Sequence, residues 1–255
     1  MRLTRGFTLI ELLVVIALIA VLIGILLPAL GHARKSARNV MSLSQLHQIS
    51  AGVQMYADEH RSYYPDVTES TGYFGPVGNF PGTWMYHIAS SIPDRQGYRS
   101  PLDDNETAWN LPDGDPERRL TSYGLNAFVT SNHPPYWGLR QEDVRQAARF
   151  ITLAEMEDHF PDDHFTPMLW GEGAPFTPAT GTDPTGAPYD VTEDRDLNWL
   201  DGTGVLGIAL TRNGGTSGNY GFADGHASAH RLDDVFSYTP PSAPTRNDFD
   251  PKFAN

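Results

Sequence analysis

One apolar stretch, from Phe7 to Leu30, constrains this chain more than any other feature. Seventeen of its twenty-four residues are Leu, Ile, Val or Phe, and its single charged residue is Glu11. At about −0.3 to −0.6 kcal/mol for each such residue, the favourable insertion energy exceeds the roughly 2.5–3.5 kcal/mol cost of one carboxylate. A helix of this length would be about 36 Å long and would span a hydrocarbon core of about 30 Å. We therefore expect a retained transmembrane helix, since no A-x-A-like cleavage site follows it.

The junction before the apolar stretch carries a recognisable motif. A six-residue leader, MRLTRG, precedes it, and the junction reads RGFTLIE from Arg5 to Glu11. This junction resembles the class III leader of type IV pilins and type II secretion pseudopilins. The resemblance implies that a prepilin peptidase cuts after Gly6 and methylates the new amino terminus at Phe7. It also implies that Glu11 is the family's glutamate and that Pro28 is its helix-kinking proline.

Glu11 needs a partner if it is to lie in an apolar environment. Buried carboxylates are paired in proteins, and the α-amino group that cleavage would create at Phe7 is largely cationic at neutral pH. We therefore expect Glu11 of one subunit to pair with the Phe7 amine of a neighbour when the apolar helices bundle.

Charge is divided unevenly along the chain. The first 61 residues contain six Lys or Arg and three Asp or Glu, whereas the net charge of the whole chain is −13, so the remainder carries −16. Phosphate binding needs clustered basic residues, and we therefore expect no nucleic acid partner. The chain contains no cysteine, so the outer domain must be stabilised by its core or by a metal rather than by disulfides.

The hydrophobic pattern changes after Leu30. Pro28 and Gly31 interrupt the apolar stretch, and we expect a bend or local unwinding of the helix there. From His32 to about Glu59, apolar residues recur at three- and four-residue steps, which predicts an amphipathic helix with one buried face. The residues of this predicted face are Ala33, Ala37, Val40, Leu43, Leu46, Ile49, Val53 and Tyr56.

Beyond this helix, Gly, Pro, Asn and Asp separate short apolar pieces, which predicts strands and loops. The predicted strands cover residues 122–130, 150–156, 205–210, 220–223 and 227–231, with a short helix at 142–148. The predicted class is α+β, with the long N-terminal helix packed on a small antiparallel sheet that has long loops. The expected division is a leader (1–6), a transmembrane and assembly helix (7–30), an amphipathic stem (31–60), an acidic β-rich domain (61–237) and a flexible tail (238–255).

A second resemblance lies near the end of the chain. The segments RNGG (212–215) and NYGFADGH (219–226), with SYGLN (122–126) upstream, are similar to the H-x9-DG signature of a large bacterial group of pseudopilin-like proteins. Asn213 stands where the signature has histidine, one residue is inserted before Asp224, and Ser100 stands where relatives often have cysteine. From the residues alone, Asp224, Gly225 and His226 between two apolar stretches predict a hairpin turn. A ligand site is the alternative.

Two acidic segments contain residue types that bind divalent metals. The first has no established ligand spacing, so a solvated loop is the favoured interpretation; its residues are Glu155, Glu157, Asp158, His159, Asp162, Asp163 and His164. In the second, Asp194, Asp196 and Asn198 alternate as at the start of a Ca²⁺ loop, but Trp199 stands where that loop needs Gly. A Ca²⁺ site of another geometry at these three residues is the one candidate cofactor site.

The sequence contains no G-x-S-x-G, H-E-x-x-H or P-loop motif, and we do not expect an enzyme. The resemblance implies a structural pseudopilin of a type II secretion or type IV pilus-like filament, anchored first in the bacterial inner membrane by a single span with its C-terminal domain in the periplasm. The implied partners are the prepilin peptidase, other pilin or pseudopilin subunits, the inner-membrane assembly platform and membrane lipid. The alternative is a membrane-tethered binding or hydrolytic domain exported with a pilin-type signal.

Overall fold

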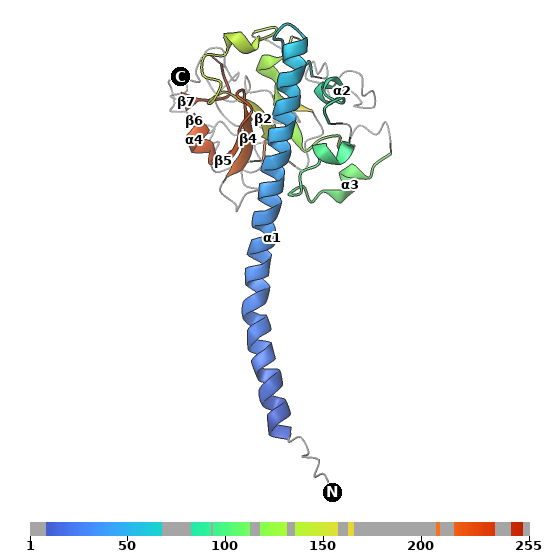
Figure 1. Ribbon diagram of the computed structural model, residues 1–255, viewed down its shortest axis with the longest axis vertical. Coiled ribbons are helices and arrows are strands. Elements are labelled where there is room, and N and C mark those ends of the chain that lie inside the picture. Colours follow the sequence, from blue (N-terminus) through green and yellow to red (C-terminus); the bar gives the residue numbers. More distant parts are fainter. Residues whose placement is uncertain are drawn as a thin grey trace, which may run out of the picture.

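A computed structural model shows a long helix whose C-terminal half is built into a mixed α/β domain and whose N-terminal half projects away from it (Figure 1). The structure describes residues 9–67, 83–92, 94–112, 118–131, 136–157, 163–165, 208–209, 217–237 and 246–251. The α+β class predicted from the sequence is confirmed.

The long helix, α1 (Leu9–Glu59), is continuous over 51 residues. Pro28 lies inside it, and the helix is not interrupted at Pro28 or at Gly31. The expected local unwinding is therefore wrong, and Figure 1 shows only a gentle curve along the projecting half. Proline removes one backbone donor and crowds the preceding turn, but the regular apolar residues on both sides favour the helix. The end of the amphipathic helix near Glu59 is confirmed.

Five strands form one sheet in the order β3-β1-β2-β4-β5. These strands are β1 (Tyr123–Asn126), β2 (Ile151–Glu155), β3 (His164–Phe165), β4 (Gly218–Phe222) and β5 (Ala227–His230). The β1–β2, β2–β4 and β4–β5 pairs are antiparallel, whereas β1 and β3 are parallel. The sheet is therefore mixed, and the expectation of a purely antiparallel sheet is wrong at the β3 edge.

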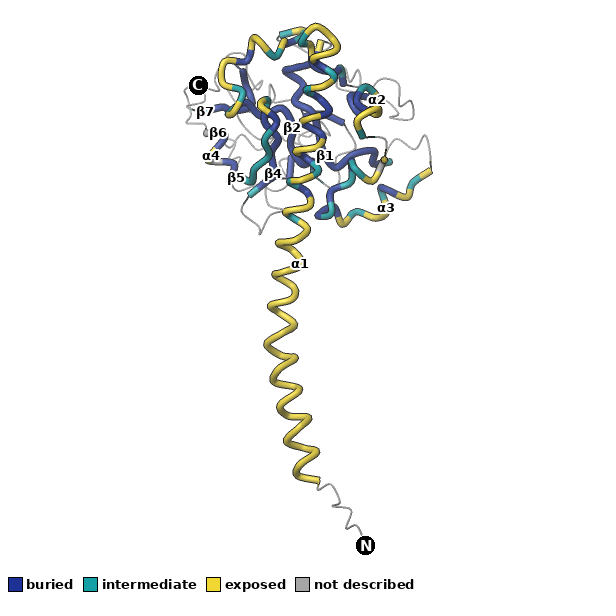
Figure 2. The backbone as a smooth tube through the Cα atoms, in the orientation of Figure 1, coloured by how far each residue is buried: buried dark blue, intermediate teal, exposed yellow. Residues whose placement is uncertain are grey.

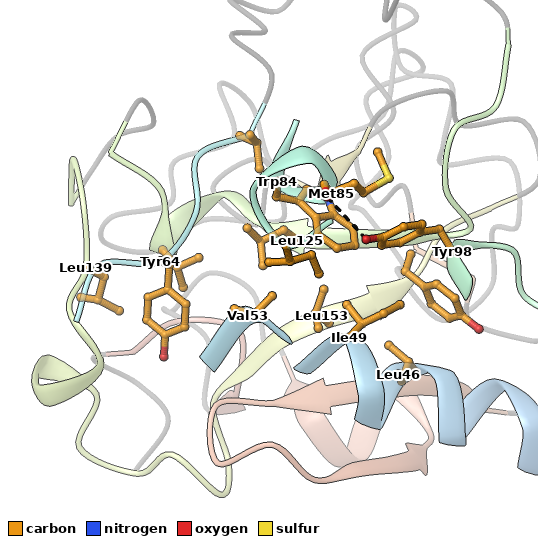
Figure 3. Packing of buried hydrophobic residues seen from close by; sticks show 14 of the residues in the cluster. Leu46, Ile49, Val53, Tyr64, Trp84, Met85, Tyr98, Leu125, Leu139 and Leu153 are labelled. Carbon is orange, nitrogen blue, oxygen red and sulfur yellow. Dashed lines mark hydrogen bonds between the residues drawn. The ribbon is translucent and has the colours of Figure 1, made fainter. Parts of the chain in front are cut away.

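The C-terminal half of α1 packs on one face of this sheet, where Leu46, Ile49 and Val53 contact a core that includes Leu125 and Leu153 (Figure 3). These three residues of the predicted buried face are confirmed. Two short elements beside α1 complete this core, namely α2 (Trp84–His87), which contributes Trp84 and Met85, and the 3-10 helix η2 (Arg95–Tyr98), which contributes Tyr98. A further short helix, α3 (Glu106–Trp109), follows them in the chain.

The predicted buried face begins too early in the sequence. Ala33 and Ala37 are exposed because they precede Asn39, where α1 contacts the sheet, and the whole projecting part of α1 is exposed (Figure 2). Val40 is exposed because it lies about 120° around the helix from Leu46. Leu43 and Tyr56 are half-buried. Helical periodicity identifies a face, but it does not show where along the helix the partner surface starts.

A second core covers the other face of the sheet. Tyr220 and Phe222 of β4 pack there with Phe249, whose ring lies 5.8 Å from that of Tyr220. The segment after α4 (Leu232–Val235) returns to this core through β6 (Phe236–Ser237), which pairs with β7 (Arg246–Asn247). Residues 246–251 are therefore ordered parts of the fold, and the expected flexible tail is wrong for them because Phe249 anchors the segment.

Two further predictions need correction. The strand predicted at 122–130 ends at Asn126, and a 3-10 helix, η3 (Ala127–Val129), follows it. The helix predicted at 142–148 is replaced by the single 3-10 turn η4 (Gln141–Asp143) and further turns. Of the strand predicted at 205–210, the structure describes Ile208 and Ala209, and Ile208 forms an isolated antiparallel bridge with Met156.

Candidate assembly helix and its seat on the sheet

The projecting half of α1 is exposed, and as far as Leu30 it is apolar on all sides apart from Glu11. Every residue from Leu9 to Arg38 is exposed, and an 18-residue window within the helix has a mean hydropathy of 3.2 with none of it buried (Figure 2). A soluble surface does not keep so large an apolar area in water, so this half requires a membrane or other helices around it. Glu11 lies in the first turn of this half and is exposed. Gly6 and Phe7 lie outside the described residues.

Small residues allow α1 to approach the domain closely on two sides. A Cβ atom added at Gly221 of β4 would lie 2.7 Å from Ser50 Oγ of α1, and one added at Gly52 of α1 would lie 3.3 Å from Ile88 Cδ1. The two glycines therefore set how deeply the helix is seated between the sheet and the α2 segment.

A buried carboxylate joins α1 to the sheet. Glu155 of β2 is 1% exposed, and its Oε1 atom accepts hydrogen bonds from Ser42 Oγ of α1 and from Ser100 Oγ at 2.6 Å. Within the described part of the chain, its Oε2 atom has no hydrogen-bond partner. The expectation that Glu155 belongs to a solvated acidic loop is therefore wrong, as it is for Asp163 and His164, which are also buried.

Further polar contacts between α1 and the sheet lie on either side of Ser42 along the helix. Asn219 of β4 donates a hydrogen bond from Nδ2 to Asn39 Oδ1 at 2.8 Å, and the Tyr123 hydroxyl of β1 donates to Gln45 Oε1 at 2.7 Å. Asn39 and Gln45 are half-buried, whereas Asn219 and Tyr123 are fully buried. Because hydrogen bonds require defined geometry, these contacts fix the position of α1 along its axis as well as its distance from the sheet.

The hairpin predicted around Asp224, Gly225 and His226 is confirmed as the β4–β5 turn. Gly225 has φ +92°, which favours glycine, and the Asp224 carboxylate accepts a hydrogen bond from the His226 backbone amide at 3.1 Å. The turn also contacts α1, because the Gly225 carbonyl oxygen lies 2.7 Å from His47 Nδ1 and the Ala223 carbonyl accepts from Gln54 Nε2 at 2.9 Å. The turn therefore holds α1 against the sheet through these two contacts.

The SYGLN segment upstream belongs to the same arrangement. Ser122 donates a hydrogen bond to Asp103 Oδ2 at 2.6 Å, and Asn126 Nδ2 donates to the carbonyls of Ile151 and Phe249, both at 2.8 Å. A Cβ atom added at Gly124 would collide with Met156 Sδ, so a side chain there would require the Met156 side chain to move. Asn213, at the position of the signature histidine, lies outside the described residues.

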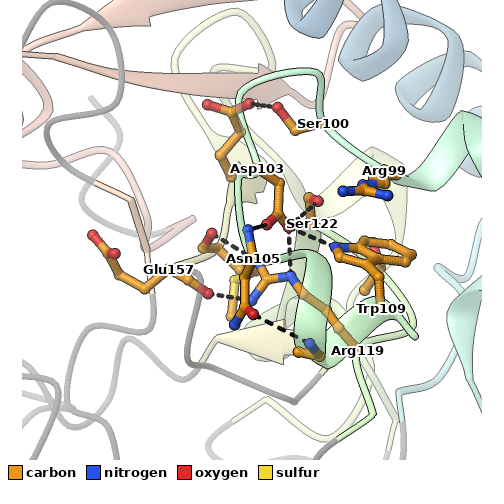
Figure 4. Close-up of polar contacts among 12 residues, drawn as sticks. Arg99, Ser100, Asp103, Asn105, Trp109, Arg119, Ser122 and Glu157 are labelled. Atoms are coloured by element: carbon orange, nitrogen blue, oxygen red, sulfur yellow. Dashed lines mark hydrogen bonds and ion pairs between the residues drawn. The ribbon is translucent and has the colours of Figure 1, made fainter. Parts of the chain in front are cut away.

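A buried ion pair holds the segment before β1 against the sheet (Figure 4). Arg119 Nε lies 2.7 Å from Asp103 Oδ2, and their side chains are 1% and 0% exposed. The same carboxylate oxygen accepts from Trp109 Nε1 at 3.0 Å, and Arg119 Nη2 donates to the Met156 carbonyl at 2.9 Å. Each charge is thus compensated, as a buried pair must be to be stable.

Two half-buried histidines have altered proton affinity. Burial lowers the pKa of His87, an effect that Asp66 partly offsets and His60 reinforces. Burial likewise lowers the pKa of His230, which packs edge-on against Phe222 with their ring centroids 5.7 Å apart. Both imidazoles are therefore neutral in the folded protein at neutral pH.

No group of three His, Asp or Glu side chains among the described residues is arranged to hold a metal ion. Asp194, Asp196 and Asn198, the candidate Ca²⁺ residues, lie outside the described residues, as do Asp158, His159 and Asp162.

The sequence reasoning missed the polar residues on the inner face of α1. Asn39, Ser42 and Ser50 alternate with the apolar core positions, and each lies against β2 or β4. These polar residues recur among the apolar residues of the buried face, and this pattern could have predicted their contacts. Polar residues on a buried face need hydrogen-bond partners on the opposing surface.

Comparison with known proteins gives similarity at the N-terminal end of the chain. Residues 1–27 match the family model for the prokaryotic N-terminal methylation motif. It is 44% identical over 63 residues to the type IV wide pilus major component PilA4 of Thermus thermophilus. That alignment covers 25% of this chain and 48% of PilA4, so the chain spans about half the length of this curated relative. No solved structure matches the chain.

Proposed function

We propose that this chain is the precursor of a structural filament subunit, a pilin or pseudopilin of a type IV pilus-like or type II secretion filament, and that its role is not catalytic. The proposal is carried by one observation: the segment that matches the methylation motif continues into α1, which is exposed from Leu9 to Arg38 and is almost wholly apolar around the whole helix as far as Leu30. Such a rod is suited first to a bilayer and then to the interior of a helical bundle.

In this proposal a prepilin peptidase cuts the precursor after Gly6 and methylates Phe7. Before assembly α1 anchors the chain in the bacterial inner membrane as a single span, with the acidic domain on the periplasmic side. An inner-membrane assembly platform then transfers subunits from lipid into the filament. Glu11 supports the scheme because it is the single charge in the apolar stretch and stands close to the new amino terminus.

Mass spectrometry of the intact mature protein tests the proposal. The expected mass is that of a chain beginning at Phe7 with one added methyl group. A Gly6→Val variant should keep the MRLTRG leader and remain in the membrane fraction. Native protein that still begins with MRLTRG, in cells with a working processing enzyme, contradicts the proposal.

Electron microscopy of producing cells then tests assembly. Filaments that contain this chain, and that are absent with the Gly6→Val variant, would support a subunit role. A mature, methylated chain that never enters a filament would instead favour a membrane-tethered domain.

A further inference from the structure

The charged residues of α1 fall into three groups that are widely spaced along one rigid rod. Apart from Glu11, they are the basic collar, defined as Arg34, Lys35 and Arg38, and the acidic tip, defined as Asp58 and Glu59. All five residues of the two groups are exposed. Because α1 is continuous, the axial distance between the groups is fixed at about 36 Å for a separation of about 24 residues.

The basic collar lies on the side of α1 that carries the domain. Lys35 and Leu46 are eleven residues apart, about three helical turns, so Lys35 shares the face that is buried further up, whereas Arg34 lies on the flank of that face. The ion pair between Arg38 Nη1 and Asp104 Oδ1, at 3.5 Å, shows that Arg38 also points toward the domain. Lys35 and Arg38 therefore face the space beneath the domain, and Arg34 borders it.

The acidic tip points away from the domain core at the opposite end of the seated half. The tip is extended by Glu142 and Asp143, because Gln141 N of η4 donates a hydrogen bond to the Ser62 carbonyl at 2.9 Å. Arg140, the nearest basic residue of η4, is held by Glu142 at 3.1 Å and by the ring of Tyr63. The four carboxylates of this region outnumber its basic residues Arg61 and Arg140, so the surface around the acidic tip carries a net negative charge.

We propose that in the filament the basic collar of one subunit binds the acidic tip of a second copy, displaced by about 36 Å along the axis. This inference rests on the proposed filament function and specifies the register within it. Arg34 and Lys35 stand 24 residues before Asp58 and Glu59, respectively, so a single displacement of two parallel copies brings both pairs to the same height. The contact is heterologous, with different surfaces on the two copies, and therefore propagates along a filament.

Cysteine cross-linking provides the test, because the native chain contains no cysteine. In a Lys35→Cys, Glu59→Cys double variant, the two Cα atoms of one chain are about 36 Å apart along α1, far beyond the distance of about 7 Å that a disulfide allows. Every cross-link between these positions therefore joins two copies. We expect sheared filaments of this variant to give a ladder of multimers after oxidation on non-reducing gels.

Two controls separate this register from others. The Lys35→Cys single variant should give no ladder, because it links copies only when they stand at equal height. A Lys35→Cys, Gln48→Cys variant places its second cysteine on an exposed position of α1, about 17 Å short of Glu59. A ladder from this variant and none from the Lys35→Cys, Glu59→Cys variant would overturn the proposal.

Charge reversal tests the attraction itself. Arg34→Glu with Lys35→Glu should lower the assembled fraction by about two- to tenfold, as expected for the loss of two exposed ion pairs. Adding Asp58→Lys and Glu59→Lys should restore assembly, which a merely misfolded chain would not do. If the reversed variant assembles normally but binds phosphatidylglycerol vesicles less than phosphatidylcholine vesicles, the collar serves lipid and the proposal is overturned.

Electron microscopy of the same samples distinguishes failure of the register from failure of the filament function. The Lys35→Cys, Glu59→Cys variant is imaged before oxidation, so that assembly is scored independently of cross-linking. Filaments that form but never cross-link between 35 and 59 would contradict the register alone. Absence of filaments in the unsubstituted protein would contradict the proposed function.

Discussion

The hydroxyl of Ser42 on α1 donates a hydrogen bond to the carboxylate of Glu155 on β2, and both side chains are completely enclosed. The contact connects residues that are 113 positions apart in the sequence. It lies where the projecting helix enters the domain, so it connects the exposed apolar half of α1 to β2, the middle strand of the sheet.

Substitution of Ser42 by Ala should destabilise the domain. A hydrogen bond to a buried charged group contributes roughly 1.5–3 kcal/mol, and Glu155 would keep only the Ser100 donor among the described residues. Thermal unfolding of the detergent-solubilised full-length chain, followed by near-ultraviolet circular dichroism, measures the change. Ser44→Ala, two residues away on an exposed part of α1, is the matched control and should leave the melting temperature unchanged within error.

Two adjacent aspartates should respond very differently to the same substitution. Asp103→Asn leaves the buried Arg119 guanidinium without its counter-ion and should cost about 3–5 kcal/mol of unfolding free energy. Asp104→Asn removes an exposed pair with Arg38 and should cost at most about 0.5 kcal/mol. Urea denaturation of both variants measures the difference, and equal losses would contradict the assigned role of the buried pair.

Stability should fall as the pH drops because of His87. Burial lowers its pKa in the folded protein, so the unfolded chain binds a proton more readily, and protonation favours unfolding. The stabilisation is complete above the ordinary histidine pKa of about 6.5 and is lost as the pH falls through the lower folded value. Melting temperatures between about pH 8 and 5 should therefore decline less steeply in His87→Gln than in the native chain. Parallel curves would contradict the effect.

Glu11→Ala should block assembly while leaving the chain in the membrane. The substitution makes the apolar half of α1 easier to insert, since it removes the one charge in the apolar stretch. It also removes the expected partner of the Phe7 amine in a neighbouring subunit, which would leave that amine uncompensated in an apolar bundle. Membrane fractionation and counts of sheared filaments measure the two effects separately. Normal filaments from this variant would show that Glu11 does not pair in the assembly.

Local patterns in the sequence were sufficient for the elements with strong periodicity. The apolar stretch, the end of α1 near Glu59 and the core positions Leu46, Ile49 and Val53 follow from repeats that depend on few neighbours. The β4–β5 turn was predicted for the same reason, because Asp-Gly favours the required backbone on its own. The family match to residues 1–27 confirms the leader resemblance at the same end of the chain.

The predictions that were wrong concern residues whose environment is set by distant parts of the chain. Glu155 looks like one of many acidic residues in the sequence, and only the approach of Ser42 and Ser100 in the fold encloses it. Phe249 lies among charged residues that suggest a loose end, yet it completes the core on the far face of the sheet. Pairing across long sequence separations carries no local signal, so neither position could be inferred from its neighbours.

The continuity of α1 has a mechanical consequence. The β4–β5 turn contacts His47 and Gln54, and from there down to Leu9 the helix is not interrupted at Pro28 or Gly31. In the proposed membrane-anchored state, a pull on the globular domain would be transmitted along α1 to its N-terminal end, because the described helix contains no break that could absorb it. Extraction of the chain from lipid would then require the whole shaft to move as one piece.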